Sequence, residues 1–201
     1  MLTNIKSNIE NYLLFLMLLI FVVYKIPHLY EPLFWDGLGV YGRSIFTLID
    51  TEIGFQPKYL EPNMSRGHPM LYVYLTALFT NFFGSDIFAM HLFNLVVAVI
   101  TLFSTYYIGA KLWTKRIGLF ASLLLVSQAL FIAQSVTVLP EMMLALFLLW
   151  SVYFFLKEQW PLYFIAVSLA LMTKETAVYL PPVFAFILFF YVFCKSIGIF
   201  K

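Results

Sequence analysis

The sequence carries little charge and few of the side chains from which soluble proteins build chemical sites. Only 11% of its 201 residues are charged, and it contains one cysteine and three histidines. Cys194 has no partner for an internal disulfide, and the scattered histidines lack the spacing of a zinc site. A net charge of +2 is too small to indicate a nucleic-acid partner. The sequence also lacks a Gly-rich phosphate loop, heptads and internal repeats.

Hydrophobic residues are abundant instead, at 63% of the chain, and the mean hydropathy is +0.92. Soluble globular domains contain about 45–50% apolar and about 25% charged residues. A chain of this length buries only about 70% of its surface on folding. This composition excludes a soluble enzyme, a nucleic-acid-binding domain, a disulfide scaffold and a disordered tail. The sequence predicts a polytopic membrane protein.

Stretches without Asp, Glu, Lys or Arg locate the expected helices. They cover residues 11–24, 67–85, 87–110, 117–140, 142–156, 159–173 and 176–194. None alternates with the period of a barrel strand, so the predicted fold class is all-α, a polytopic membrane helix bundle. The first stretch lacks a small-residue cleavage site, and we expect an uncleaved first crossing over 11–29 with Lys25 reaching the interface.

Residues 30–86 differ in composition and predict an external loop with juxtamembrane helices. The part from 30 to 68 carries three basic and five acidic residues: Glu31, Asp36, Arg43, Asp50, Glu52, Lys58, Glu61 and Arg66. The densest basic connection comes later, at Lys111, Lys115 and Arg116, and the positive-inside rule assigns it to the cytoplasm.

An acidic loop outside and a basic connection inside require an odd number of crossings between them. Two hydrophobic stretches lie there, and 67–85 is the weaker because it begins Gly-His-Pro and ends near Asn81 and Gly84. We therefore expect 67–85 to lie in the outer interface. The chain is then one module over residues 1–201, with its remaining crossings over 87–194, about six crossings in total and both termini cytoplasmic. If 67–85 spans instead, the positive-inside count fails.

Two acids near the expected outer face are candidate catalytic groups. Asp36 follows the first crossing among aromatic residues, where a carboxylate partly out of water is a plausible general base. The alternative for Asp36 is a solvated loop acid beside an aromatic belt. Glu141 follows Pro140 and also fits a simple role in the first turn of a helix. The six-crossing topology places both carboxylates on one face of the membrane.

Cations at the same face are candidate phosphate ligands. Arg66 and His68 end the loop, where they suit either a phosphate or lipid headgroups. Lys174 and Glu175 interrupt an apolar tract, so Lys174 either meets a lipid-linked phosphate or snorkels at a helix break. His91 and Asn94 share a helix face and are interpreted as interhelical hydrogen-bond partners, not as ligands.

The order of these features resembles the GT-C glycosyltransferases, in particular the group of protein O-mannosyltransferases, aminoarabinose transferases and Rgt-like proteins. An acid with a nearby tyrosine, Asp36 and Tyr41, follows the first helix. The other elements are Gly67-His-Pro-Met-Leu-Tyr-Val-Tyr-Leu75, Phe83-Gly-Ser-Asp-Ile-Phe-Ala89, Leu112-Trp-Thr-Lys-Arg-Ile-Gly-Leu-Phe-Ala121, Thr137-Val-Leu-Pro-Glu-Met-Met143 and Leu171-Met-Thr-Lys-Glu175.

The resemblance implies a multi-pass plasma-membrane glycosyltransferase that takes a sugar from a polyprenyl-phosphate donor and transfers it on the external face with inversion. It implies Asp36 and Glu141 as catalytic carboxylates, with Tyr41 and Glu175 supporting them. Arg66, His68 and Lys174 are then the candidates for the donor phosphate. No cofactor and no protein metal site are expected, and the sequence leaves open whether a divalent cation assists.

Two departures from the group's pattern keep a second hypothesis open. Gly37 stands where the group often has Glu, and Tyr41 follows Asp36 by five positions instead of four. Family members are also commonly more than twice as long. The alternative is a truncated or non-catalytic module that binds lipid-linked sugar or completes an enzyme in trans, with a partner subunit or a missing C-terminal half. A small transporter is a weaker third reading, because the acids gather at one face and no repeat is present.

Overall fold

The computed structural model describes residues 9–60, 64, 67–84 and 86–196, and these residues form helices joined by short loops, without a strand. This agrees with the predicted all-α class. The first part of the chain contains α2 (Ile9–Lys25), η1 (Ile26–Tyr30), η2 (Gly37–Gly42), α3 (Arg43–Asp50) and η3 (Pro57–Tyr59). The second part contains α5 (Leu71–Phe83), α6 (Ile87–Leu112), α7 (Lys115–Val126), α8 (Ala129–Gln134), α9 (Glu141–Leu156), α10 (Trp160–Thr173), η4 (Glu175–Tyr179) and α11 (Leu180–Ser196).

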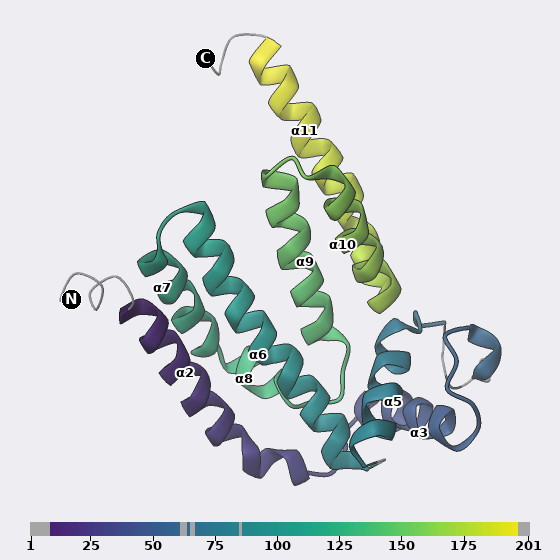
Figure 1. Cartoon of the computed structure of the whole chain (residues 1–201). Helices are drawn as coiled ribbons and strands as arrows, with labels where there is room; N and C mark the ends of the chain where they lie inside the picture. The colour runs from purple at the N-terminus through teal and green to yellow at the C-terminus, as the bar shows by residue number, and fades with distance from the viewer. Residues whose placement is uncertain (1–8, 61–63, 65–66, 85, 197–201) are drawn as a thin grey trace.

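The long helices alternate in direction between two ends of a bundle (Figure 1). One end holds the start of α2, the α6–α7 turn and the α9–α10 turn. The opposite end, at the lower right of Figure 1, holds η1, α3, α5, the start of α9 and the end of α10, and we call it the site end. The basic α6–α7 connection and the loop that contains residues 30–60 therefore lie at opposite ends.

Within the described part of the chain, two helical segments, Ile9–Tyr30 and Ile87–Leu112, are long and apolar enough to cross a membrane by length and composition. The helices α5, α9 and α10 are shorter, with 13, 16 and 14 residues. At 1.5 Å per residue, α5 is about 20 Å long, less than the roughly 30 Å hydrocarbon core. The number of crossings and the interfacial place of α5 remain predictions.

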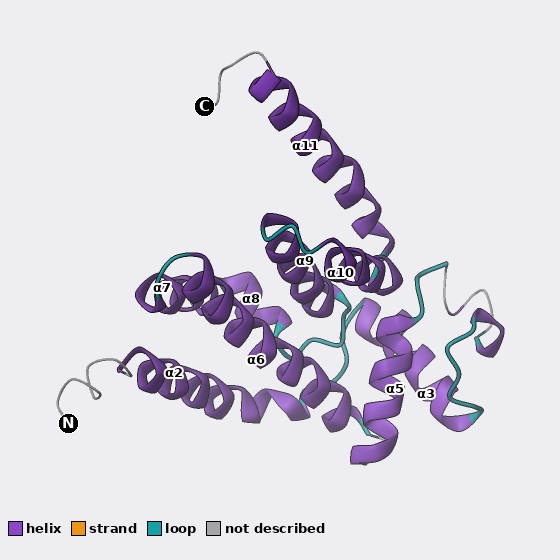
Figure 2. Cartoon of the chain, turned by 45° about the horizontal axis from the view of Figure 1, so that its top comes forward, coloured by secondary structure: helices purple, strands orange, loops and turns teal. Residues whose placement is uncertain are grey.

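The helix α6 is the centre of the bundle and contacts α2, α5, α7 and α9. Its buried residues join those of α2, α3, α5 and α9 in the main core. A smaller core of Tyr163, Val167 and Phe184 lies between α10 and α11, and α11 extends away from the other helices (Figure 2). Large apolar side chains such as Phe15 on α2 and Phe120 on α7 are about two-thirds exposed. Such exposure is unfavourable in water and suits contact with lipid.

The expected helix over 117–140 is interrupted, because α7 ends at Val126 and α8 begins at Ala129. Two side chains at the break donate hydrogen bonds to the carbonyl oxygen of Leu124, Ser127 Oγ at 2.8 Å and Gln128 Nε2 at 3.2 Å. Polar side chains that bond to nearby backbone compete with the helical ladder. The sequence reasoning missed this break.

The helices α6 and α7 approach closely where Gly109 faces Gly118. A Cβ added to Gly109 would lie 2.7 Å from the Cα of Gly118, and one added to Gly118 would lie 2.3 Å from the carbonyl oxygen of Tyr106. Small residues at a crossing let two backbones pack directly against each other, as in other membrane helix pairs. Ser122 Oγ adds a buried hydrogen bond of 3.0 Å to the Leu102 carbonyl in the same interface.

We expect Gly118→Ala to lower the free energy of unfolding by about 1–3 kcal/mol, because the added methyl group meets backbone that cannot move aside. Thermal unfolding of the purified protein in detergent measures this change. Gly39→Ala is the control, since nothing lies within 4 Å of a Cβ at that position. Equal melting temperatures for the two variants would contradict a tight α6–α7 contact.

Candidate functional site

Four segments meet at the site end and carry six of the seven candidate residues. The turn before η2 carries Asp36, and η2 itself carries Tyr41. The other four are His68 before α5, Glu141 at the first position of α9, Lys174 after α10 and Glu175 at the first position of η4. The seventh candidate, Arg66, lies outside the described residues.

Tyr41 is the centre of this arrangement. Its side chain is buried, and its ring centroid lies 5.7 Å from that of His68 and 5.6 Å from that of Tyr72. Burial raises the pKa of Tyr41, and the negative charges of Glu141, Glu175 and Asp36 raise it further. The phenol therefore stays protonated at neutral pH, and the three carboxylates all lie close enough to act on it.

Two of these carboxylates each contact a basic side chain. The Lys174 ammonium donates a hydrogen bond to Glu141 Oε1, and His68 Nδ1 lies 3.1 Å from Glu175 Oε2. The first pair joins the end of α10 to the start of α9, and the second joins η4 to the segment before α5. The other oxygen of Glu141, Oε2, is buried and has no hydrogen-bond partner among the described residues. Lys174 and His68, two of the three residues that the sequence assigned to a phosphate, thus contact carboxylates in this structure.

Asp36 differs from these two acids because its side chain is exposed. It makes no hydrogen bond or ion pair with the residues that the structure describes. The preceding residue, Trp35, has a φ of 47°, a left-handed conformation that costs a non-glycine residue on the order of 1–3 kcal/mol. Its carbonyl oxygen accepts hydrogen bonds from the N–H groups of Leu38 and Gly39, so the strained turn leads directly into η2.

Close packing explains why glycine stands at position 37, where the group often has glutamate. A Cβ at this position would lie 3.3 Å from the carbonyl oxygen of Val138. The turn that carries Asp36 therefore packs against the segment that leads into Glu141. A glutamate side chain at Gly37 would require one of these segments to shift.

His91 contacts both the loop that leads to Asp36 and the loop that leads to Glu141. It is buried on α6, with Nδ1 beside the carbonyl oxygen of Val136 and Nε2 3.0 Å from the carbonyl oxygen of Glu31. Three residues after it, Asn94 Nδ2 donates a 2.9 Å hydrogen bond to the hydroxyl oxygen of Tyr72. The expected interhelical hydrogen bond is confirmed for Asn94, which joins α6 to α5. For His91 the expectation is wrong in its partner, because the ring contacts the carbonyl groups of two loops and not another helix.

Tyr72 is a site residue that the sequence reasoning missed. It is fully buried, and its ring packs edge-on against Tyr41. The tyrosines at positions 72 and 74 are two residues apart and so point in different directions from α5. No feature of the sequence distinguished the buried tyrosine from the other.

A metal centre has no candidate ligands in the part of the chain that the structure describes. No group of three or more His, Cys, Asp or Glu side chains there is placed to hold a metal ion. The chemistry that these residues offer is proton transfer by carboxylates and electrostatic stabilisation by a lysine and a histidine.

Residues 67–199 match the family described as dolichyl-phosphate-mannose-protein mannosyltransferase. The chain belongs to this family. His68, Glu141, Lys174 and Glu175 lie within the matched residues, whereas Asp36 and Tyr41 precede them. Membership supports a membrane protein of the GT-C glycosyltransferase type and a lipid-linked sugar donor. No curated protein and no solved structure matched the chain.

The pairing of His68 with Glu175 predicts a dependence of stability on pH. Burial alone would raise the pKa of the Glu175 carboxyl, but the His68 hydrogen bond, a backbone hydrogen bond and the charges of His68 and Lys174 lower it below its usual 4.5. A lowered folded-state pKa stabilises the protein above pH 4.5, and this contribution disappears as the pH falls through the folded value.

We therefore expect wild-type protein to lose more stability than His68→Leu when the pH falls from about 5 to 3. The difference should stay below about 1 kcal/mol because the pair is partly exposed. Melting temperatures across this pH range measure the effect. His28→Leu, which removes another histidine–glutamate pair, controls for general acid effects. Parallel pH profiles for wild type and His68→Leu would contradict the assignment.

Proposed function

We propose that this protein is an integral-membrane glycosyltransferase that transfers a sugar from a polyprenyl-phosphate donor to an acceptor on the external face, with Asp36 as the catalytic base. One observation supports this most directly. Of the three carboxylates around Tyr41, Glu141 and Glu175 are paired with cations, while Asp36 is exposed and has no partner among the described residues. An unpaired, accessible carboxylate is available to accept a proton.

The proposed step is a single inverting displacement. A hydroxyl oxygen of the acceptor attacks the anomeric carbon of the sugar, and its proton passes to the Asp36 carboxylate. The bond between the anomeric carbon and the phosphate oxygen breaks, and both of its electrons remain on the departing polyprenyl phosphate. A positioned general base contributes about 10²- to 10⁴-fold to such a rate.

Lys174 and His68 would stabilise the negative charge of the departing phosphate, together with Arg66. In the structure Glu141 and Glu175 hold the first two cations at the site end. A cation already held in place by a partner needs little rearrangement when phosphate arrives, which is the advantage of a preorganised site. We therefore propose that Glu141 is the second carboxylate of the site and acts by positioning Lys174, and that Glu175 does the same for His68.

The proposed setting is the plasma membrane, with about six crossings and the site end outside. The basic α6–α7 connection at the opposite end supports this orientation. Tyr41 would support catalysis as a protonated donor between the carboxylates. The acceptor is not specified by these residues, and the proposal includes a partner subunit or further chain that completes the acceptor site.

We expect Asp36→Asn to lower kcat by about 10²- to 10⁴-fold, because the amide cannot take the acceptor proton. Transfer of labelled sugar from a polyprenyl-phosphate donor to membranes of the expressing cells measures this. Asp50→Asn is the matched control, since Asp50 is an exposed acid of the same loop. Full activity of a folded Asp36→Asn variant would refute the assigned base, and inactivity of the wild type until a second subunit is added would favour the non-catalytic module.

A different kinetic change is expected for Lys174→Gln. Loss of a charge-assisted hydrogen bond to the phosphate costs about 1.5–3 kcal/mol, or roughly 10- to 100-fold in kcat/KM for the donor. The same assay with the donor concentration varied checks this. Lys157→Gln is the control because this exposed lysine lies at the other end of α9. Equal values for both variants would mean that Lys174 serves only to hold α9 and α10 together.

A further inference from the structure

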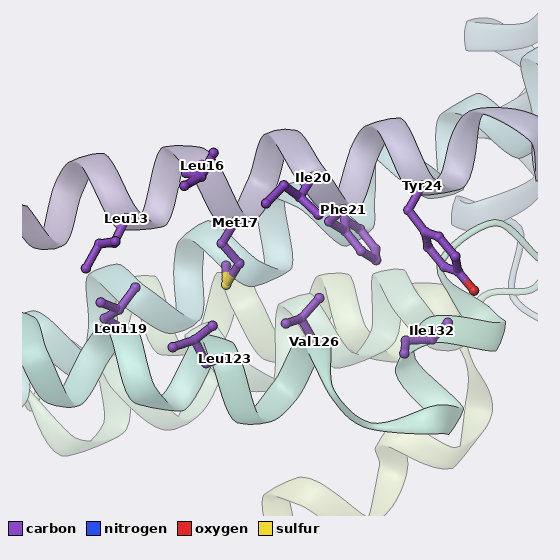
Figure 3. A pocket seen from close by; sticks show the side chains of 10 residues that line it. All are labelled: Leu13, Leu16, Met17, Ile20, Phe21, Tyr24, Leu119, Leu123, Val126 and Ile132. Atoms are coloured by element: carbon purple, nitrogen blue, oxygen red, sulfur yellow. The ribbon is translucent and has the colours of Figure 1, made fainter.

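An apolar groove lies on the side of the bundle where α2 passes α7 and α8 (Figure 3). Its volume is about 410 Å³. Side chains of α2 form one wall, from Leu13 to Tyr24, and those of α7 and α8 form the other, from Leu119 to Ile132. In Figure 3 the segments that form the two walls run parallel to each other, and the groove follows the long axis of α2.

Tyr24 and Ile132 lie at one end of the groove. These two residues also line a second cavity of about 660 Å³, which continues toward Leu33 and Phe34. Its wall contains polar groups, among them Lys25 and His28. The apolar groove therefore adjoins this second cavity, which we call the chamber, at the site end just before the turn that carries Asp36.

Lys25 is the lysine in the wall of this chamber, and it is almost completely buried. The residue is only 3% exposed. Its ammonium donates one hydrogen bond to the carbonyl oxygen of Ile132 and lies 5.4 Å from the centroid of the Tyr24 ring. It forms no ion pair with any residue that the structure describes.

Glu31, the acid of the chamber, acts on this charge only at a distance and forms no ion pair with it. Glu31 lines the same cavity, but its Oε1 lies 2.6 Å from His28 Nδ1 and forms an ion pair there. An ammonium has three N–H donors, of which Lys25 uses one for a carbonyl oxygen. A buried cation without a directly paired counter-ion is costly at the edge of a membrane, and an anion in the chamber would lower that cost.

The length of the groove indicates which anionic amphiphile fits. Leu13 and Tyr24 are eleven positions apart on α2, which corresponds to about 16 Å along a helix. The hydrocarbon core of a bilayer is about 30 Å thick, so the groove covers about one leaflet. An acyl chain of a leaflet lipid has this reach, whereas a long polyprenyl chain would extend past Leu13.

We propose that this groove and chamber form a binding site for an anionic phospholipid, with one acyl chain between α2 and α7–α8 and the headgroup phosphate on Lys25. The site is separate from the cations Lys174 and His68 and does not depend on the proposed transfer reaction. A bound phospholipid would fill the space beneath the turn from Leu33 to Asp36 and support that turn.

Native mass spectrometry of the full chain in mild detergent tests this proposal with added phosphatidylglycerol or phosphatidylcholine. We expect phosphatidylglycerol to remain bound and phosphatidylcholine to be lost. Lys25→Met should weaken phosphatidylglycerol binding about 10- to 100-fold through loss of a charge-assisted hydrogen bond. Lys25→Arg should retain binding, and Lys58→Met, at an exposed lysine of the loop, should leave it unchanged.

A second pair of variants tests the groove without touching the cation. Leu123 lines the groove and its neighbour Leu124 does not, so Leu123→Trp should weaken binding and Leu124→Trp should not. This pair decides the question if Lys25→Met fails to fold, as judged by its melting temperature. Equal retention of both phospholipids, or equal binding by the two Trp variants, would overturn the proposal. Displacement of phosphatidylglycerol by an equimolar polyprenyl phosphate would also overturn it and assign the groove to the donor.

Discussion

The contact of His91 with two backbone carbonyl groups is the interaction on which the arrangement of the site depends. Glu31 and Val136 belong to the loops that lead into Asp36 and Glu141, and neither loop is part of a helix. Their carbonyl groups therefore have no helical ladder to satisfy them, and a buried unsatisfied carbonyl is costly. The His91 ring on the central helix α6 contacts both carbonyl groups. A neutral imidazole has one N–H and donates to only one of the two, but the loops that lead to the two acids are both placed relative to the same buried residue.

The charges of the site are balanced with one exception. Lys174 and His68 are partly exposed and each faces a carboxylate, which lowers the cost of placing a charge at a membrane surface. Each pair also connects two elements that are far apart in the sequence. Asp36 stands outside this balance, in a turn whose backbone strain is maintained by hydrogen bonds to the Trp35 carbonyl. Strained backbone of this kind is concentrated at functional positions.

Much of the fold was predictable because uncharged stretches of sufficient length must be helical in lipid. The contact between Glu141 and Lys174 was also within reach of the sequence. Two helices joined by a short turn run antiparallel, so the start of α9 must lie beside the end of α10. The reasoning placed Glu141 and Lys174 on one face but did not pair them. His68 and Glu175 are 107 positions apart, and no local pattern could bring them together.

The break after Val126 and the strain at Trp35 could not be predicted for a different reason. Both depend on competition between local hydrogen bonds and the regular backbone ladder, whose alternatives differ little in free energy. Composition indicates the total apolar surface but not such small free-energy differences between local backbone conformations. The same limit applied to Lys25, where snorkelling to the interface was expected and the structure instead shows a buried ammonium bound to the Ile132 carbonyl.

Aromatic side chains indicate the depth at which the site operates. Trp35 and Tyr30 are 81% and 73% exposed, and Phe34 stacks on Trp35 with centroids 5.4 Å apart. Exposed tryptophan and tyrosine favour the headgroup level of a bilayer, and Asp36 directly follows Trp35. A lipid-linked donor carries its phosphate at that same level, because its hydrocarbon chain stays in the core. Under the proposed function, base and donor therefore meet at one depth without the sugar leaving the membrane surface, and the acceptor must approach from the aqueous side.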